Sequence, residues 1–150
     1  MKILLATVSN RRSKASGPSA EMLQEYISRA SRLMTCTHRN FGTEDEFLEY
    51  LLGAAGRTKP MALLADRDGQ QLSSEEVAEV IRFARDGGTQ QWVLAIGPAD
   101  GWSPGARARA DKLLAFGRIT LPHELAAVVA AEQVYRALTI LSGHPYHCGH

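Results

Sequence analysis

Short apolar runs alternate with stretches of helical periodicity along this chain, and that alternation limits its possible folds most. The apolar runs cover 2–8, 60–65 and 91–96, and each ends at polar or turn-forming residues, as strands do. The stretches between them are long enough for helices. Strands that alternate with helices are typical of an α/β domain with a mainly parallel sheet and helices on both faces.

Helix signals fill the intervals between these runs. Thr43-x-x-Glu46 and Ser73-x-x-Glu76 both have the form of a capping box, in which a hydroxyl and a carboxylate satisfy free N–H groups. Apolar spacing predicts helices over 21–33, 43–55, from the second box to the glycines at 87–88, over 104–112, and after 122. Residues 66–69 are expected to form the turn that ends the strand at 65.

The last expected helix is apolar on more than one side. Its main stripe includes Leu125, Val128 and Leu138, and Val129 and Ile140 widen it beyond one buried face. A helix of this kind often packs against a partner chain on its second side. We therefore expect a contact between chains there.

The length and composition suit one globular domain over 1–150. The chain has 150 residues, of which 45% are hydrophobic and 22% charged, and this excludes a disordered or fibrous chain. No apolar run approaches the roughly 20 residues that span a bilayer, so we expect a cytoplasmic protein without a membrane partner. In that compartment Cys36 and Cys148 are expected to be thiols.

The charge is small overall and uneven along the chain. The formal net charge of +1 argues against nucleic-acid binding over the whole surface. Residues 1–40 nevertheless carry seven Lys and Arg against two Glu. Such a basic end fits a local phosphate contact, and a solvated basic surface is the alternative.

Sheets of this kind usually bind ligands in the loops at the carboxyl ends of their parallel strands. In this chain the candidate loops are 65–69, 97–105 and 116–122. No G-x-G-x-x-G follows an expected strand and no P-loop motif occurs, so nicotinamide and P-loop nucleotide binding lack their main support. Gly97 and Gly101 would let a ligand approach the backbone closely, and a structural turn is the alternative.

Two further patterns resemble a hydrolase site and a metal site, but each lacks a group that such a site needs. Residues 101–105 have the G-x-S-x-G form of a hydrolase nucleophile elbow, but the residue after Ser103 is Pro104, which has no N–H for an oxyanion. The tail after 143 holds three histidines and a cysteine, yet no second cluster completes a metal site. We expect neither serine hydrolysis nor a functional metal.

Five motifs occur in order in the second half of the chain. They cover 72–76, 96–104, 119–125, 131–137 and 143–147, and read LSSEE, IGPADGWSP, ITLPHEL, AEQVYRA and GHPYH. Together they resemble the RlmH family, the 23S ribosomal RNA pseudouridine-N3 methyltransferases of the SPOUT superfamily. The likeness is close over 63–147 and loose over 9–60.

The resemblance implies a C-terminal trefoil knot, a homodimer and S-adenosyl-L-methionine as cofactor. It implies that the cofactor is held by Ala65, Gly97, Phe116, Gly117, Arg118, Ile119, Thr120 and Leu121. These positions fall in the same three strand-end loops that the sheet argument selects.

The resemblance also implies a substrate and a catalytic tail. The substrate is large-subunit ribosomal RNA in the assembled ribosome, and the residues expected to touch its phosphates are Arg11, Arg12 and Lys14. In the tail, Tyr146 and His147 are the implied catalytic residues. His123 is a weaker catalytic candidate, and a capping or packing role at the start of the last helix is the better interpretation. Glu132 and Arg136 most simply form a surface ion pair or a dimer contact.

The chain departs from the family pattern at four positions. Pro98 stands where the family usually has a glycine, Gly117 replaces a serine, and Ala127 and Cys148 replace arginines. Two lost arginines remove bidentate contacts to phosphate or carboxylate, and Arg118 is a candidate to compensate for one. Two alternatives stay open: a non-catalytic dimeric RNA- or ribosome-binding relative, and a SPOUT methyltransferase with another RNA target.

Overall fold

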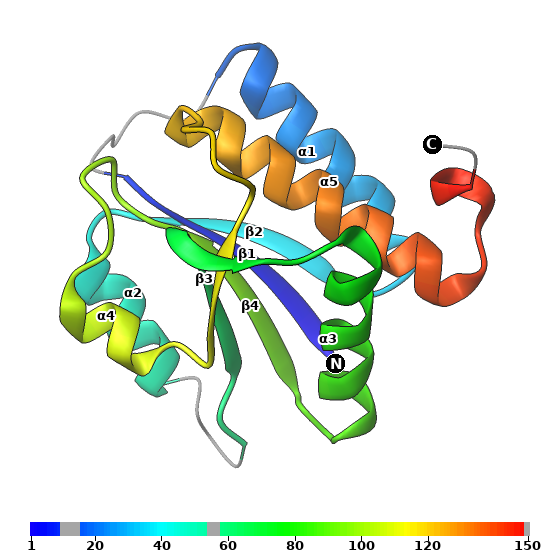
Figure 1. Cartoon of the computed structure of the whole chain (residues 1–150), viewed down its shortest axis with the longest axis horizontal. Coiled ribbons are helices and arrows are strands. Elements are labelled where there is room, and N and C mark those ends of the chain that lie inside the picture. The colour runs from blue at the N-terminus through cyan, green and yellow to red at the C-terminus, as the bar shows by residue number, and fades with distance from the viewer. Residues whose placement is uncertain (10–15, 54–57, 149–150) are drawn as a thin grey trace.

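The computed structural model of the chain describes residues 1–9, 16–53 and 58–148, and Figure 1 shows their arrangement. The strands are β1 Lys2–Val8, β2 Cys36–Phe41, β3 Met61–Gln71, β4 Gln91–Ile96 and β5 Lys112–Ala115. The helices are α1 Pro18–Ser31, α2 Glu44–Gly53, α3 Ser74–Asp86, α4 Pro104–Arg109 and α5 His123–Ser142, followed by the 3₁₀ turn η1, Pro145–His147.

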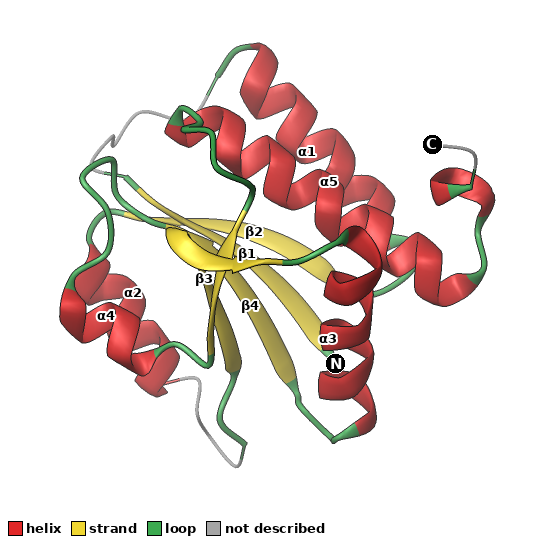
Figure 2. Cartoon of the chain, in the orientation of Figure 1, coloured by secondary structure: helices red, strands yellow, loops and turns green. Residues whose placement is uncertain are grey.

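Within the described residues the strands form one parallel sheet in the order β2-β1-β4-β3-β5. Side chains of β1 alternate between the faces: Ile3 and Leu5 join one core cluster, and Leu4 and Ala6 join the other. Helices α1, α3 and α5 cover the first face, and α2 and α4 cover the second (Figure 2). The expected α/β class with helices on both faces is confirmed.

Two strands lie where the sequence predicted none. β2 carries mostly polar residues and pairs with β1 at the edge of the sheet. β5 lies at the end of the helix predicted over 104–112, which is therefore wrong after 109. The reason is Asp111, whose N–H donates to the Ala62 carbonyl at 2.9 Å and whose carboxylate accepts the Ala62 N–H at 2.8 Å. These bonds fix the start of β5 beside β3.

The turn predicted at 66–69 is also wrong, because β3 continues to Gln71. One residue of β5, Leu114, pairs with β3 on both sides of an irregularity, so β3 bulges across β5. Gly69 lies at this crossing. A Cβ there would be 2.6 Å from backbone atoms of Leu113 and Leu114, so the crossing requires a residue without a side chain.

α5 is the core helix of the first layer. It packs against α1 and α3, and its buried residues include Val128, Ala131 and Val134. By length and composition it is apolar enough to cross a membrane, but here it fills the core between those helices and the sheet.

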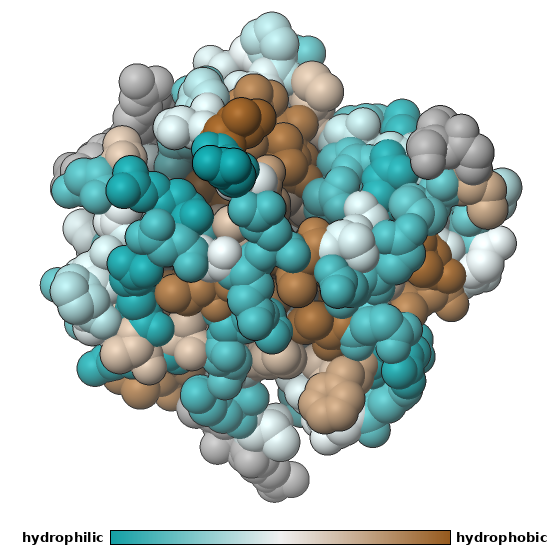
Figure 3. Space-filling model, viewed as in Figure 1, coloured by the Kyte–Doolittle hydropathy of each residue, from teal (hydrophilic) through white to brown (hydrophobic). Residues whose placement is uncertain are grey.

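Large apolar side chains are exposed near the starts of α1 and α5. Ser19 of α1 donates to the Glu124 carboxylate at 3.3 Å, which holds the two helix starts together. Met22, Ile119 and Leu125 are the exposed apolar residues of this region, with exposed fractions of 49%, 74% and 45%, and we call them the α1–α5 surface. Figure 3 shows apolar surface gathered over this part of the molecule.

Candidate functional site

The three segments that the sequence selected as strand-end loops come together at one edge of the sheet, although the first of them, 65–69, is part of β3. Ala65 of β3 pairs with Ile96 of β4 and with Leu114 of β5, so these three positions lie at one level of the sheet. Gly97 directly follows β4, and Phe116 directly follows β5. The register of the sheet therefore places the three selected segments near one another, and their role as a ligand site stays a prediction.

Trp102 lies between Ala65 of β3 and Gly97, the residue after β4, and sequence reasoning missed it. Its indole N–H donates to the Ala65 carbonyl at 2.9 Å. A Cβ at Gly97 would lie 2.7 Å from the same indole, so Gly97 lets the ring approach the backbone. The glycines of this loop were the available signal, because a glycine that faces a large side chain marks a close approach.

The loop after β4 is fixed by a carboxylate from α2. Ser103 donates to Glu44 through its N–H at 2.8 Å and through its hydroxyl at 2.6 Å, and the same hydroxyl accepts the Ala106 N–H at 3.1 Å. Ser103 is thus a helix cap, which agrees with the exclusion of a hydrolase elbow. A hollow of about 350 Å³ opens beside it, lined by Glu44, Pro98, Asp100, Gly101, Trp102 and Ser103.

The loop after β5 presents free backbone groups. From Gly117 to Thr120 the backbone makes no hydrogen bond to other backbone groups in the described part of the chain. Gly117 has φ +108°, a left-handed conformation that favours glycine, and Arg118, Ile119 and Thr120 are exposed. This loop offers N–H and C=O groups to a ligand without first breaking internal bonds.

His123, the first residue of α5, has a buried Nε2 with no hydrogen-bond partner among the described residues. The cap position is Pro122, and no side chain caps this helix. The structure therefore does not support His123 as a capping residue of α5. It does support a packing role, because part of the ring is buried. A buried nitrogen without a partner costs about 1–3 kcal/mol, so a ligand group that bonded to it would recover that energy.

The tail folds back on α5 and joins Tyr146 to an ion pair. Arg136 donates to Glu132 Oε1 through Nε at 2.9 Å and Nη2 at 2.6 Å, and the Tyr146 hydroxyl donates to the same oxygen at 3.0 Å. Glu132 and Arg136 are 17% and 18% exposed, so they are more than a surface ion pair. Burial, followed by hydrogen bonds with Tyr26 and Glu132, raises the pKa of Tyr146 above its ordinary value.

His147 is held at both ring nitrogens. Its Nδ1 lies 3.2 Å from Arg136 Nη1, and its Nε2 lies 2.8 Å from Glu75 Oε1 in the first turn of α3. Glu75 falls within the LSSEE motif, but the capping-box interpretation drew attention to Glu76 instead. The two residues implied as catalytic thus lie together in one network with Glu132, beside α5.

The tail network and the strand-end loops lie at different places along α5. Tyr146 and His147 contact Glu132 and Arg136, nine and thirteen residues after His123. At 1.5 Å per residue these contacts lie roughly 14–20 Å along the helix from its first residue, which follows the loop after β5. The structure of one chain therefore does not bring the two groups of candidate residues together.

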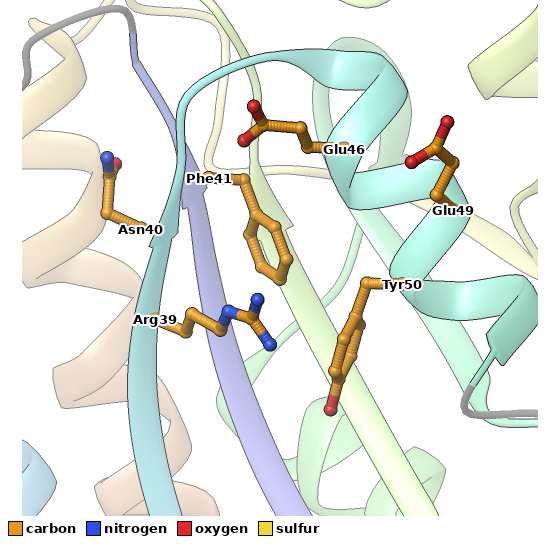
Figure 4. Close-up of a pocket in the computed structure, with 6 residues that line it drawn as sticks. All are labelled: Arg39, Asn40, Phe41, Glu46, Glu49 and Tyr50. Carbon is orange, nitrogen blue, oxygen red and sulfur yellow. The ribbon is translucent and has the colours of Figure 1, made fainter.

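The remaining candidates lie apart from these groups. Arg11, Arg12 and Lys14 are outside the described residues. A second hollow of about 390 Å³ lies between β2 and α2, where the Arg39 guanidinium covers the rings of Phe41 and Tyr50 at 4.6 and 5.0 Å (Figure 4). It borders none of the three strand-end loops, since β1 separates β2 from β4.

Comparison with known proteins connects this arrangement to a family. The model of the family described as "Predicted SPOUT methyltransferase" matches residues 1–147. This chain belongs to the SPOUT methyltransferase family. The family likeness that the five motifs indicated is thereby confirmed.

Two SPOUT relatives are similar over most of their length, and both are named Ribosomal RNA large subunit methyltransferase H. The protein from Koribacter versatilis is 46% identical over 126 residues, which are 84% of this chain and 86% of the relative. The protein from Sphingopyxis alaskensis is 40% identical over 131 residues, 87% of each chain.

A solved SPOUT-type structure supports the fold. The SpoU methyltransferase AviRb from Streptomyces viridochromogenes, in complex with the cofactor AdoMet, matches with a TM-score of 0.50 and 13% sequence identity. The match covers 95% of this chain and 61% of the AviRb chain. At this identity the likeness concerns the fold.

Proposed function

We propose that this SPOUT protein is an S-adenosyl-L-methionine-dependent methyltransferase that methylates N3 of a pseudouridine in 23S ribosomal RNA of the assembled ribosome. The observation that carries the proposal is the meeting of Ala65 with the loops after β4 and β5 at one edge of the sheet, in a chain of this family. The names of the two relatives that match most of the chain support the ribosomal RNA substrate.

The residues of the strand-end loops fit the cofactor. Ala65, Gly97 and 116–121 would hold it, because the free backbone groups of the last loop suit the polar edge of an adenine and the methionine part. The unpartnered Nε2 of His123 offers one more polar contact at the same place. When bound, the cofactor supplies a methyl group on a positively charged sulfur.

The protein has to orient the acceptor nitrogen and take up its proton. Tyr146 and His147 are the tail groups that can do this, since a phenol can hydrogen-bond a base edge and a neutral imidazole can accept a proton near pH 7. Arg11, Arg12 and Lys14 supply phosphate contacts, which a protein of small net charge needs in order to grip RNA locally.

The separation between loops and tail favours a homodimer. Within one chain the candidate catalytic groups lie well beyond contact distance of the cofactor loop, whereas methyl transfer needs reacting atoms about 3–3.5 Å apart. A second copy that packs on the α1–α5 surface would cover its exposed apolar residues. Membership of the SPOUT family supports a trefoil knot at the C-terminal end of the domain, and the family's ribosomal substrate supports a cytoplasmic location.

One observation favours the non-catalytic alternative, a dimeric RNA- or ribosome-binding relative. Cys148, exposed in the tail, stands where the family usually carries an arginine. Ala127, the other such position, is 4% exposed and packs in the core of the first layer, so its small side chain belongs to the packing of α5. A SPOUT methyltransferase with another RNA target is the third possibility.

Methyl transfer to ribosomes that lack the modification tests the proposal. Labelled methyl from S-adenosyl-L-methionine should appear on a large-subunit pseudouridine with the wild-type chain and be strongly reduced with Tyr146→Phe or His147→Ala. Tyr50→Phe, on α2 at the opposite face, is the matched control and should retain activity. Cofactor binding without transfer to ribosomes would indicate another RNA; neither binding nor transfer would indicate the non-catalytic relative.

A further inference from the structure

The imidazole of His147 is bridged between two helices. Arg136 of α5 approaches Nδ1, and Glu75 of α3 approaches Nε2, at the distances given above. A guanidinium nitrogen can donate a hydrogen bond and cannot accept one. Nδ1 must therefore be the accepting nitrogen, which leaves the ring proton on Nε2, where the Glu75 carboxylate accepts it.

We propose that Glu75 is a positioning residue for methyl transfer, which holds His147 as the Nε2–H tautomer and so makes Nδ1 the basic nitrogen. The inference rests on the proposed function, since it assigns a role within the same reaction. A carboxylate that accepts one imidazole N–H fixes the ring and stabilises the imidazolium that forms when the other nitrogen takes a proton.

The first turn of α3 is fixed firmly enough for this role. A capping box begins the helix: the Ser73 hydroxyl accepts the Glu76 N–H at 3.1 Å, and the Glu76 carboxylate accepts the Ser73 N–H at 2.7 Å. Ser74 donates to the Gln133 side chain on α5 at 2.7 Å. Gln133 in turn donates to Glu132 at 2.7 Å. The residue before Glu75 is thus tied to the carboxylate that holds Tyr146.

Contact with His147 also changes Glu75. The hydrogen bond from His147 is the largest of several effects that lower the pKa of the Glu75 carboxyl. The contact with the tail therefore favours the ionised carboxylate. Glu75 is 62% exposed and His147 27%. At such exposure an ion pair adds little stability, so orientation of the ring is what this contact contributes.

The geometry suggests how the proton moves. Arg136 Nη1–H now donates to Nδ1, in the place that the N3–H of the acceptor base would take. When the base binds, the proton of its N3–H bond would pass to Nδ1, and the electron pair left on N3 would take the methyl group. Bound S-adenosyl-L-methionine would supply that methyl group and keep the electrons of the broken methyl–sulfur bond, while Glu75 would face the imidazolium of His147.

Histidine ¹⁵N NMR and steady-state kinetics together test the role of Glu75. The wild-type spectrum should show His147 protonated at Nε2 and not at Nδ1. In Glu75→Ala we expect a mixture of both tautomers, a kcat lower on the order of 10-fold, and a KM for ribosomes changed by less than about twofold. Glu75→Gln keeps an acceptor oxygen and should restore the Nε2–H tautomer with an intermediate kcat.

Glu79→Ala is the matched control. Glu79 lies one turn further along α3 and accepts from Arg82 at 2.6 Å, but it is outside the tail network. It should leave the His147 spectrum and kcat unchanged. If Glu75→Ala leaves the tautomer unchanged, or leaves kcat unchanged, the inference is wrong while the proposed function stands. If the wild-type chain transfers no methyl to ribosomes, the proposed function fails and the inference falls with it.

Discussion

Thr7, at the end of β1, joins two side chains of β2 and shows how a single hydroxyl orders a strand edge. Its proton goes to Asn40 Oδ1 at 2.9 Å, so the His38 Nε2, also 2.9 Å from the hydroxyl oxygen, must donate. Burial lowers the pKa of His38 below its ordinary value. The folded chain therefore holds this histidine neutral at pH values where an unfolded chain binds a proton.

Because of His38, the stability of the folded chain should decrease as the pH is lowered. Above about pH 6.5 both states are neutral and the residue has no effect; below it the unfolded state takes up a proton that the folded state resists. The loss continues until the pH reaches the lowered pKa of the folded state. Urea unfolding at about pH 7.5 and about pH 5.5 should show a larger loss for the wild type than for His38→Gln, which keeps a donor. Equal losses would contradict this account.

The two cysteines should differ in reactivity. Burial raises the pKa of Cys36 to about 12, whereas Cys148 is exposed. At about pH 8 a disulfide reagent should modify Cys148 in the native chain and both thiols after unfolding. Cys148→Ser should abolish the native reaction and Cys36→Ser should not. Fast modification of Cys36 in the native chain would contradict its buried position.

At the scale of elements, strong local signals predicted structure well and weak ones failed. The capping box at Ser73 and the apolar run over 91–96 correspond to α3 and β4. β2 was missed because it has no apolar run, and β5 because its apolar run is short and directly follows the stretch predicted as a helix. β2 is a mostly polar edge strand, and β5 is four residues long and is set by the bonds between Asp111 and β3.

The candidate site was also predicted only in part, because some of its residues carry no local signal. Topology puts loops after parallel strands at one edge, and the register does bring Ala65 and the loops after β4 and β5 together there, but 66–69 continue β3. Trp102, Glu44 and Glu75 were missed because each acts through a partner distant in sequence. No local pattern predicts that an indole will reach Ala65 or that a carboxylate of α3 will meet His147.

The crossing of β3 over β5 should be intolerant of any side chain. Gly69→Ala would push a methyl group into the backbone of Leu113 and Leu114 and should cost about 1–3 kcal/mol or more in free energy of unfolding. Gly105→Ala is the control: Gly105 lies in α4, where alanine favours helix, and a Cβ there would meet only the Ser103 hydroxyl at an ordinary 3.8 Å. Chemical denaturation of both variants measures the difference. Equal stability of Gly69→Ala and the wild type would contradict the tight crossing.

At the scale of the whole molecule, α5 organises two distinct regions. The loop after β5 and the α1–α5 surface lie at its start, and its second half carries the ion pair that holds the tail. Three exposed large apolar residues, Met22, Ile119 and Leu125, lie together at the first region, as an interface between copies would require.

Leu125→Glu should therefore weaken the proposed homodimer. A charge in the middle of an apolar contact is costly, so we expect a shift from dimer to monomer in sedimentation velocity at micromolar concentration. Leu52→Glu changes an exposed leucine on α2, at the other face of the sheet, and should leave the assembly unchanged. A dimer that tolerates Leu125→Glu would locate the interface elsewhere.

The exposed thiol of Cys148 lies one residue beyond His147, at the end of the tail that folds onto α5. Since Cys36 is buried, a fluorophore or spin label can be attached at Cys148 in the natural sequence, without engineered cysteines. Such a reporter would follow the docking of the tail as the protein meets its RNA, in real time and in the wild-type chain.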